Sequence, residues 1–418
     1  MYTEAIENNI AYLIKENSCD KDLLKLFRKT PYPKSRIGAW KYLNLDSISL
    51  DGLSIQQEDI IEPQKIIADY CEFFNISGSN IIVIHDGKLI HNNLNEHVSI
   101  KNMNKKKDNC LLNNDRLNHW YSVLNQCLAT CTLNIEISEF QDIEDTLYII
   151  HSAGSSSKEN TITNTQVNLN IAEHTKIKVT EIYTSENSEN ALIQNPKSCY
   201  HLSESAQCTH TILHHHSQFS SHFSDVNVHQ DNNSLYNCNI ITAKGKTNRT
   251  GVNIQLAGDS ASCNVHTLQW PNKDETHDIY LNIDHLSPNT SCNCLSKSIA
   301  GANAVAAFTG NITVTSDANF SEASLTNNNL LLSEHGKIFS RPELEIDNDE
   351  VKCSHGTTIG QLDKDMIFYL QSRGINANDA QSMLVSSFIS PILEKLDNSR
   401  TSICSFVKNY FQETIANE

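Results

Sequence analysis

Cysteine and histidine, two side chains that bind soft metals, lie two residues apart at Cys353 and His355. A thiolate and an imidazole together suit iron, zinc or an iron–sulfur cluster. Gly356 and Gly360 follow the pair, and an acidic segment at 345–350 precedes it, which places the pair where a strand pattern gives way to a helix pattern. Two ligands are too few to close a metal site, so the pattern predicts a half-site that a second chain would complete.

Two other groups of potential ligands have a less informative spacing. Cys292 and Cys294 would share one face of a strand, as would His214 and His216 within the histidine-rich stretch at 210–229. That stretch contains no acidic or cysteine ligand before Asp225. Because exposed strands contain polar residues anyway, its composition favours a surface strand over a specific metal site.

Nucleotide-binding and hydrolase motifs are absent from the sequence. Gly-Lys-Thr at 245–247 is similar to the end of a phosphate-binding loop, but the glycine that such a loop requires at 240 is Ile240. The sequence also has no GxGxxG, GxSxG, HExxH or CxxC motif. Any nucleotide hydrolysis linked to this protein is therefore expected to come from a partner.

The composition predicts an extended protein with a thin core. The chain has 418 residues, of which 39% are hydrophobic but only 7% aromatic, and its net charge of −17 argues against a general nucleic-acid or membrane-surface binder. Its 13 cysteines follow no regular framework, which favours free thiols in a reducing compartment. No window is apolar enough for a signal peptide or a membrane span, so we expect a cytoplasmic protein.

The hydrophobic periodicity divides the chain into three regions. Residues 1–130 are mostly helical, with a helix expected at 6–14 and a hairpin at 80–91 that turns at Asp86-Gly87. Residues 131–356 alternate apolar and polar side chains in short segments, which fits either a large β-sandwich or a β-solenoid. Inward-facing Asn residues that stack between rungs would favour the solenoid, with helical segments capping its ends.

Residues 357–418 return to helical periodicity. Leu362, Met366 and Tyr369 lie on one stripe, which Gly374 ends as a C-terminal glycine. Asn376 or Asn378 can cap the next helix. These short helices cannot form a core of their own, so their apolar faces must cover the β region or a partner.

The segment at 351–388 strongly resembles the SufB/SufD family of iron–sulfur cluster assembly proteins, with the sequence VKCSHGTTIGQLDKDMIFYLQSRGINANDAQSMLVSSF. Its Cys-Ser-His-Gly at 353–356 is similar to the SufD branch. The resemblance extends upstream through 327–346, 282–285 and 245–259 to the Trp-Lys-Tyr segment at 31–45. Two departures are Asn-Asp-Glu-Val at 348–351 and the absence of an acidic residue just before Trp40.

The resemblance implies a right-handed parallel β-helix flanked by helical N-terminal and C-terminal regions. It implies a non-catalytic subunit that supports iron acquisition and cluster assembly in a complex with SufB and the ATPase SufC. SufB would pair through the β-helix edges, with a homodimer as the alternative when SufB is absent. His355, followed by Cys353, would bind iron or a cluster transiently at that interface.

The C-terminal helices would bind SufC, and the residues expected there are Phe368, Tyr369, Arg373 and Gly374. The resemblance also implies a reduced flavin in the assembled complex, for which the sequence has no motif. Two alternatives from other classes are a secreted polysaccharide-active enzyme with a β-helix fold and a purely structural solenoid.

Overall fold

The computed structural model describes residues 21–30, 40–43, 48, 53–55, 62–78, 80–101, 119–154, 160–186, 191–399 and 403–417. The helix expected at 6–14 and the departure just before Trp40 lie outside these described residues.

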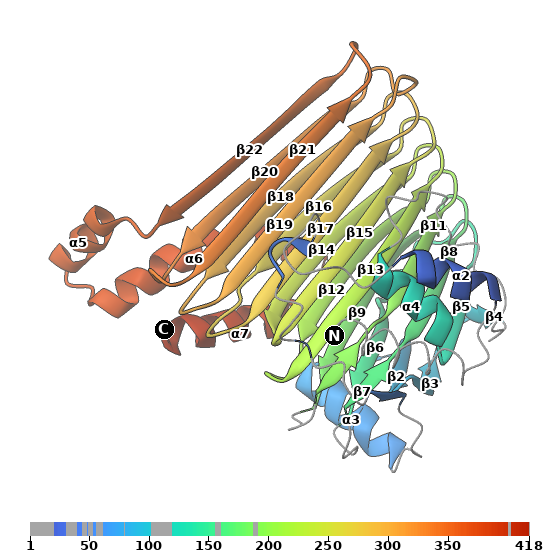
Figure 1. The fold of residues 1–418 in the computed structure, drawn as a ribbon, viewed down its shortest axis with the longest axis horizontal. Coiled ribbons are helices and arrows are strands. Elements are labelled where there is room, and N and C mark those ends of the chain that lie inside the picture. Colours follow the sequence, from blue (N-terminus) through green and yellow to red (C-terminus); the bar gives the residue numbers. More distant parts are fainter. Residues whose placement is uncertain are drawn as a thin grey trace.

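Two long sheets face each other through the body of the molecule, with the main core between them (Figure 1). From β5 onward, the strands on the main path of one sheet alternate along the chain with those of the other. Sheet A consists of β1 (Ser54–Ile55), β4 (Val98–Lys101), β5 (Cys131–Ile137), β7 (Thr161–Thr163), β8 (Thr165–Ile171), β10 (Leu192–Gln194), β11 (Lys197–Leu202), β13 (Ser220–Gln230), β15 (Thr247–Leu256), β17 (Thr276–His285), β19 (Val305–Val314) and β21 (Lys337–Ile346).

Sheet B consists of β2 (Ile81–His85), β3 (Lys88–Asn93), β6 (Leu147–Ala153), β9 (Lys176–Ser185), β12 (Gln207–His215), β14 (Leu235–Lys244), β16 (Ser262–Gln269), β18 (Ser291–Ala300), β20 (Glu322–Leu331) and β22 (Lys352–Gln361). One strand of sheet A, the next strand of sheet B and their turns form one rung. Successive rungs pair in parallel, as β13 does with β15 and β20 with β22. This pairing confirms the parallel β-helix and excludes the β-sandwich, whose sheets are antiparallel.

Alternation along each strand separates the core from the outer surface. In β5, Leu133 and Ile135 are buried in the core between the sheets, while Asn134 faces outward and is half-buried. Asn side chains do stack from rung to rung, as in the bond from Asn253 Nδ2 to Asn227 Oδ1 (3.0 Å). The expectation that they face inward is wrong for this stack, because their neighbours Val226, Val228, Val252 and Ile254 occupy the interior. Asn327 and Asn329, on the same side of β20 as the core residue Leu325, do face inward.

The turns from sheet A to sheet B repeat one backbone conformation. From the β5–β6 turn to the β19–β20 turn, each contains a residue with φ between 53° and 61°, whose N–H donates to a carbonyl in the turn of the next rung, as Asn233 does to Asp259 (2.9 Å). Left-handed backbone is unfavourable for most residue types, so these inter-rung bonds help to hold it. The seven positions are Phe140, His174, Ser205, Asn233, Ser260, Asn289 and Phe320.

Short antiparallel strands end the solenoid on its N-terminal side. β3 pairs antiparallel with β2, and β4 pairs antiparallel with β5. The hairpin predicted at 80–91 is β2–β3, with positive φ at Asp86 (49°) and Gly87 (74°) as a two-residue turn requires. The described helices of this region are α2 (Lys21–Lys29), α3 (Pro63–Phe73) and α4 (Trp120–Leu128).

A buried ion pair joins the N-terminal region to the outer face of sheet A. Arg249 of β15 pairs with Asp278 of β17, and its guanidinium lies 4.3 Å from the ring centroid of Trp40. Asp225 of β13 accepts a 2.7 Å bond from Ser122 of α4. Trp40 is therefore buried, with a cation–π contact to Arg249.

The C-terminal helices α5 (Lys364–Ser372), α6 (Ala377–Ser399) and α7 (Ile403–Asn417) follow the last strand. α6 and α7 pack on the outer face of sheet B, where Phe411 stacks on Trp270 at 5.5 Å. They cover a side of the solenoid, and α5 projects away from it (Figure 1). The expectation that helices cap both ends is therefore wrong for the C-terminal end in the part of the chain that the structure describes.

Two further expectations concern membranes and thiols. None of the described helices is both long and apolar enough to cross a membrane. Ten described cysteines are free thiols, as expected, but Cys199 is disulfide-bonded, which the sequence did not predict.

Adjacent residues on β17 allow a direct test of the two faces. Leu281 is fully buried in the core, and Asn282 lies half-buried in the outer Asn stack. We expect Leu281→Ala to lower the free energy of unfolding by about 2–5 kcal/mol because it leaves a cavity. Asn282→Ala should cost less, about 1–3 kcal/mol, the net value of its two hydrogen bonds to Asn253 and Asn311. Urea denaturation followed by circular dichroism measures both, and equal losses would contradict the assignment of the faces.

Candidate functional site

The C-terminal end of the solenoid consists of the outer edges of β21 and β22, which we call the open end. Each strand is the last of its sheet and has a neighbour on one side only among the described residues. Residues 354–361 of β22 are exposed. An edge of this length presents unpaired backbone N–H and C=O groups to which another strand can bind.

Cys353 and His355 lie on the side of β22 that continues the core. Cys353 pairs in register with Ala323, and His355 with Leu325, and both partners belong to the core. The expectation that the pair shares one face is confirmed. Their expected place at a strand-to-helix joint is wrong, because β22 continues to Gln361 and α5 begins at Lys364.

Exposure differs between the two side chains. Cys353 is half-buried against the core, while His355 is exposed above it. Neither belongs to a group of three close potential metal ligands among the described residues. Among the described residues, Cys353 and His355 therefore remain a pair of potential ligands, and their role in a half-site stays a prediction.

A column of thiols runs inward from the open end. Cys263, Cys292, Ala323 and Cys353 are successive partners in the register of sheet B. A groove of about 660 Å³ beside β22 is lined by these residues together with outward-facing neighbours such as Asn264, Asn293 and Ser354. The small side chain of Ala323 leaves Cys353 and Cys292 close enough to interact, and burial together with Cys292 raises the pKa of Cys353 above its ordinary value.

Cys292 has a different electrostatic environment from the other buried thiols. A hydrogen bond from Cys294 and the nearby imidazole of His285 lower the pKa of Cys292, against the effect of its burial. The same interaction raises the pKa of Cys294. Cys292 is therefore the thiol of this pair that ionises more readily. The sequence pointed to this cysteine pair but not to its position beneath Cys353.

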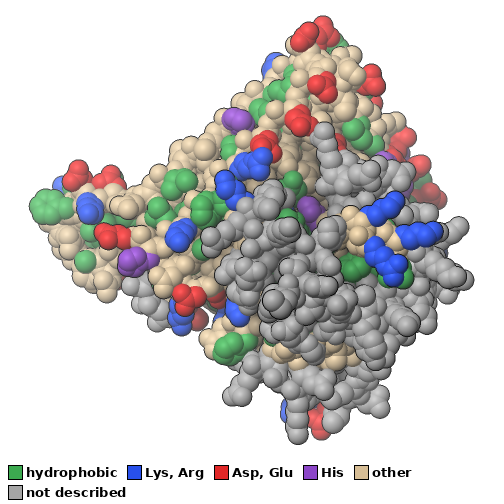
Figure 2. Space-filling view, in the orientation of Figure 1, with side chains coloured by type: hydrophobic (Ala, Val, Ile, Leu, Met, Phe, Trp, Pro, Cys, Tyr) green, Lys and Arg blue, Asp and Glu red, His purple; other side chains and the backbone are tan. Residues whose placement is uncertain are grey.

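Acidic residues surround the open end. Asp347, Asp349 and Glu350 are exposed in the turn between β21 and β22, and acidic side chains gather at that tip of the molecule (Figure 2). Lys352 pairs with Glu322 at 2.7 Å, so this basic residue does not offset the acidic turn. The resulting negative field favours the approach of cations.

The residues predicted to bind an ATPase lie on α5 (Phe368, Tyr369) and directly after it (Arg373, Gly374). Asp363 caps the helix by accepting from the backbone N–H of Asp365 (2.9 Å) and of Met366 (3.1 Å). At the other end Gly374 has φ 91°, and Ile375 N–H donates to Leu370 C=O (3.2 Å), which confirms the predicted C-terminal glycine. Asn376 then caps α6 through Asp379 N–H (2.9 Å).

α5 buries none of its side chains. Phe368 is 72% exposed and Tyr369 52% exposed, and the guanidinium of Arg373 lies 5.3 Å from the Tyr369 ring centroid. An apolar face of this kind is unusual without a partner.

The histidine-rich stretch is not a surface strand, and that expectation is wrong. His214, His216 and His222 are buried between the two sheets. Both sides of β12 are covered. Leu213 packs against the C-terminal helices on one side, and His214 faces the interior on the other. Burial lowers the pKa of His214 to about 3 and those of His216 and His222 well below the usual value.

Comparisons with known proteins identify the family. Residues 153–388, more than half of the chain, match the family described as "SUF system FeS cluster assembly, SufBD core domain". The iron-sulfur cluster assembly protein SufD of Escherichia coli is 29% identical over 276 residues, which are 65% of this chain and 64% of that protein. Protein ABCI7, chloroplastic, of Arabidopsis thaliana is 29% identical over 269 residues, or 63% of this chain and 57% of that protein.

A SufBD family protein of Synechocystis is 33% identical over 196 residues, which are 47% of this chain and 43% of that protein. The chain thus spans less than two thirds of the length of each of these relatives. The matched family region includes the thiol column, β22 and α5. This chain therefore belongs to the SufBD family of iron–sulfur cluster assembly proteins.

Proposed function

We propose that this chain is a non-catalytic subunit of a SufB–SufC–SufD-type complex that builds iron–sulfur clusters. The observation that supports this most strongly is the open end, where the outer edges of β21 and β22 frame Cys353 and His355. Iron or a nascent cluster is the cargo of this site and passes between subunits.

Strand pairing explains how a partner would complete the half-site. A second β-helix, that of SufB, would add its edge strands to β21 and β22 and continue both sheets. Its own inward side chains would then stand opposite Cys353 and His355. The thiolate and the imidazole would supply two ligands from this chain, and the partner would supply the others.

The projecting α5 supports a second contact. Phe368 and Tyr369 offer apolar area, and Arg373 adds a charge beside it. In the proposed complex this helix binds SufC, which hydrolyses ATP and moves the subunits. The reduced flavin and the cytoplasmic location stay predictions.

Replacing His355 tests its role as a ligand. We expect His355→Ala to leave the complex assembled but to lower cluster maturation in cells by about tenfold or more, because a metal ligand is lost. The matched control is Ser354→Ala, which changes the neighbouring exposed residue on the opposite face of β22. Activity of a cluster-dependent enzyme in a strain that lacks the native chain is the measurement. Wild-type maturation with His355→Ala would remove this residue from the site.

Alkylation of Cys353 tests whether the open end is an interface. Iodoacetamide should label Cys353 in the free chain and spare the buried Cys294, as peptide mass spectrometry would show. Because the pKa of Cys353 is raised above 9.0, its labelling rate should keep rising with pH beyond that value. Addition of SufB should protect Cys353, and equal labelling with and without SufB would contradict the edge-to-edge complex.

A charge on α5 tests the second contact. We expect Phe368→Asp to weaken SufC binding by about 2 kcal/mol, or about 30-fold in Kd, because a buried aromatic contact becomes a buried charge. Gln371→Ala, an exposed change on the same helix, should leave Kd unchanged. Binding is measured by calorimetry, with circular dichroism to check folding. Equal affinity of the two variants would place the SufC contact elsewhere.

A further inference from the structure

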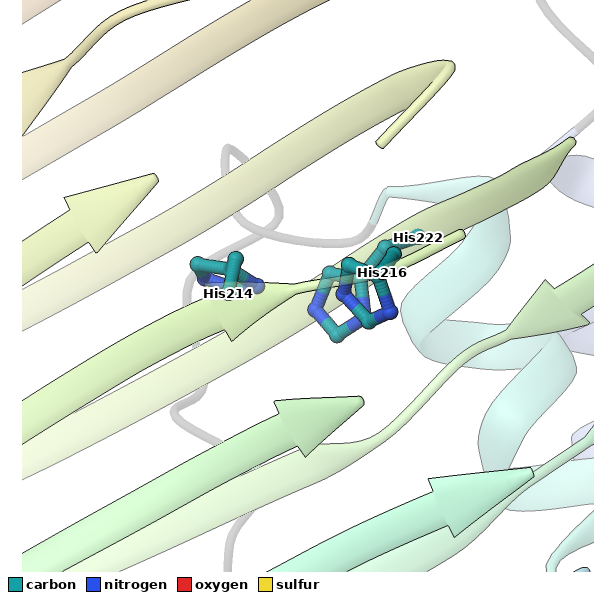
Figure 3. Close-up of side chains that lie close together, drawn as sticks. All are labelled: His214, His216 and His222. Carbon is teal, nitrogen blue, oxygen red and sulfur yellow. The ribbon is translucent and has the colours of Figure 1, made fainter. Parts of the chain in front are cut away.

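Three imidazoles converge inside the solenoid, at the corner where β12 turns into β13 (Figure 3). His214 is on β12, His216 is in the turn and His222 is on β13. Potential ligand nitrogens of all three lie within 4.8 Å of one another, and the side chains are at most 1% exposed. The ring centroids of His214 and His216 lie 4.5 Å and 4.7 Å from that of His222.

Five of the six ring nitrogens in this cluster have no hydrogen-bond partner among the described residues. The exception is His214 Nε2, which lies 3.0 Å from Thr250 Oγ1. This bond fixes the orientation of the ring and leaves Nδ1 without a hydrogen-bond partner, as a hydrogen bond on the far nitrogen does for a metal-ligating histidine. Buried polar atoms without partners are rare in proteins, so the cluster requires a reason.

A hydrogen-bonded histidine core is the simpler alternative, and the neighbouring network shows what it looks like. Glu181, also fully buried, accepts hydrogen bonds from Tyr183, Tyr200 and Ser198. His210 Nδ1 is 2.8 Å from the hydroxyl of Tyr236. These polar groups satisfy one another, whereas His216 and His222 do not take part in such bonds. An acceptor of nitrogen lone pairs would satisfy both at once.

The groups around the cluster can balance the positive charge of a bound cation. Tyr183 stacks on His214 with ring centroids 5.3 Å apart and donates its hydroxyl to the Glu181 carboxylate. The other titratable groups that face the cluster are His151, which stacks on Tyr183, and His277, which lies near His214 and His216. The buried carboxylate of Glu181 therefore lies next to the cluster. None of these neighbours is a buried Lys or Arg.

We propose that His214, His216 and His222 bind one divalent first-row transition-metal ion of the kind that prefers imidazole, Zn²⁺ or Fe²⁺. Three neutral imidazoles leave a further coordination position for water. β12 is five strands from β22 in sheet B, or about 24 Å at the usual strand spacing. The proposed site is thus separate from the open end and goes beyond the proposed function.

Metal binding by the full-length wild-type chain is the first test. The apo chain, prepared with a chelator, is dialysed against Zn²⁺ and, anaerobically, against Fe²⁺, and bound metal is measured by plasma mass spectrometry. We expect one equivalent per chain of either metal. Co²⁺ then serves as a spectroscopic probe, and its visible bands should indicate nitrogen and oxygen ligands without thiolate charge transfer. No saturable equivalent, or a thiolate spectrum that assigns the ion to the cysteines, would overturn the proposal.

Variants locate the site and include a matched control. His222→Gln and His216→Gln should weaken binding by more than about 100-fold, since loss of a ligand exceeds the about 10–100-fold effect of an outer contact. Thr250→Val keeps all three histidines and should weaken binding by the smaller factor of about 10–100. This variant covers the case in which a histidine variant does not fold. His201→Gln changes the exposed His201, His229 and Asp231 group and should leave binding unchanged. Loss of the ion in His201→Gln with retention in His222→Gln would refute the buried site.

Discussion

Hydrogen bonding between successive rungs is the interaction on which the rest of the structure depends. Every strand of the solenoid must pair in parallel with the strand one rung away, and the A-to-B turns pair as well. This requirement stacks equivalent side chains in columns and leaves unpaired edges only at the two ends. The N-terminal end finishes in antiparallel strands, whereas β21 and β22 have no outer neighbour in the part of the chain that the structure describes. The proposed cluster site lies at that open end because it is the place where a column stops and another chain can continue it.

The same stacking explains the unusual interior. A narrow space between two sheets admits few large side chains, and the columns contain small thiols and polar groups together with aliphatic residues. Cys263, Cys292 and Cys353 fall in one column, and Glu181 lies in the interior with its tyrosine donors. A buried charge is tolerated only when its partners are aligned, and the rigid rungs provide that alignment. Metal-binding chemistry at both proposed sites therefore follows from one architecture.

Much of the fold could be predicted because its signals are local. Alternation gave the strands, the Asp86-Gly87 turn gave the hairpin, and the stripe ending at Gly374 gave α5. The pair at Cys353 and His355 could be found in the same way, since residues two apart on a strand share a face. No sequence repeat was visible, because the left-handed turn position is filled by residues as different as Phe140 and Asn233. Backbone bonds hold that conformation, so selection for one side chain is weak there.

The sequence by itself therefore determined the element types, the family resemblance and the shared face of Cys353 and His355. Only the tertiary structure decided which face is inward and which residues become neighbours. His214 was assigned to a surface because periodicity cannot distinguish two covered faces, the core on one side and the C-terminal helices on the other. Stacked residues lie between 26 and 34 positions apart, as for Asn253 on Asn227 and Asn168 on Asn134. Turns of variable length separate such partners, so the register is fixed by hydrogen bonds between rungs and not by local spacing.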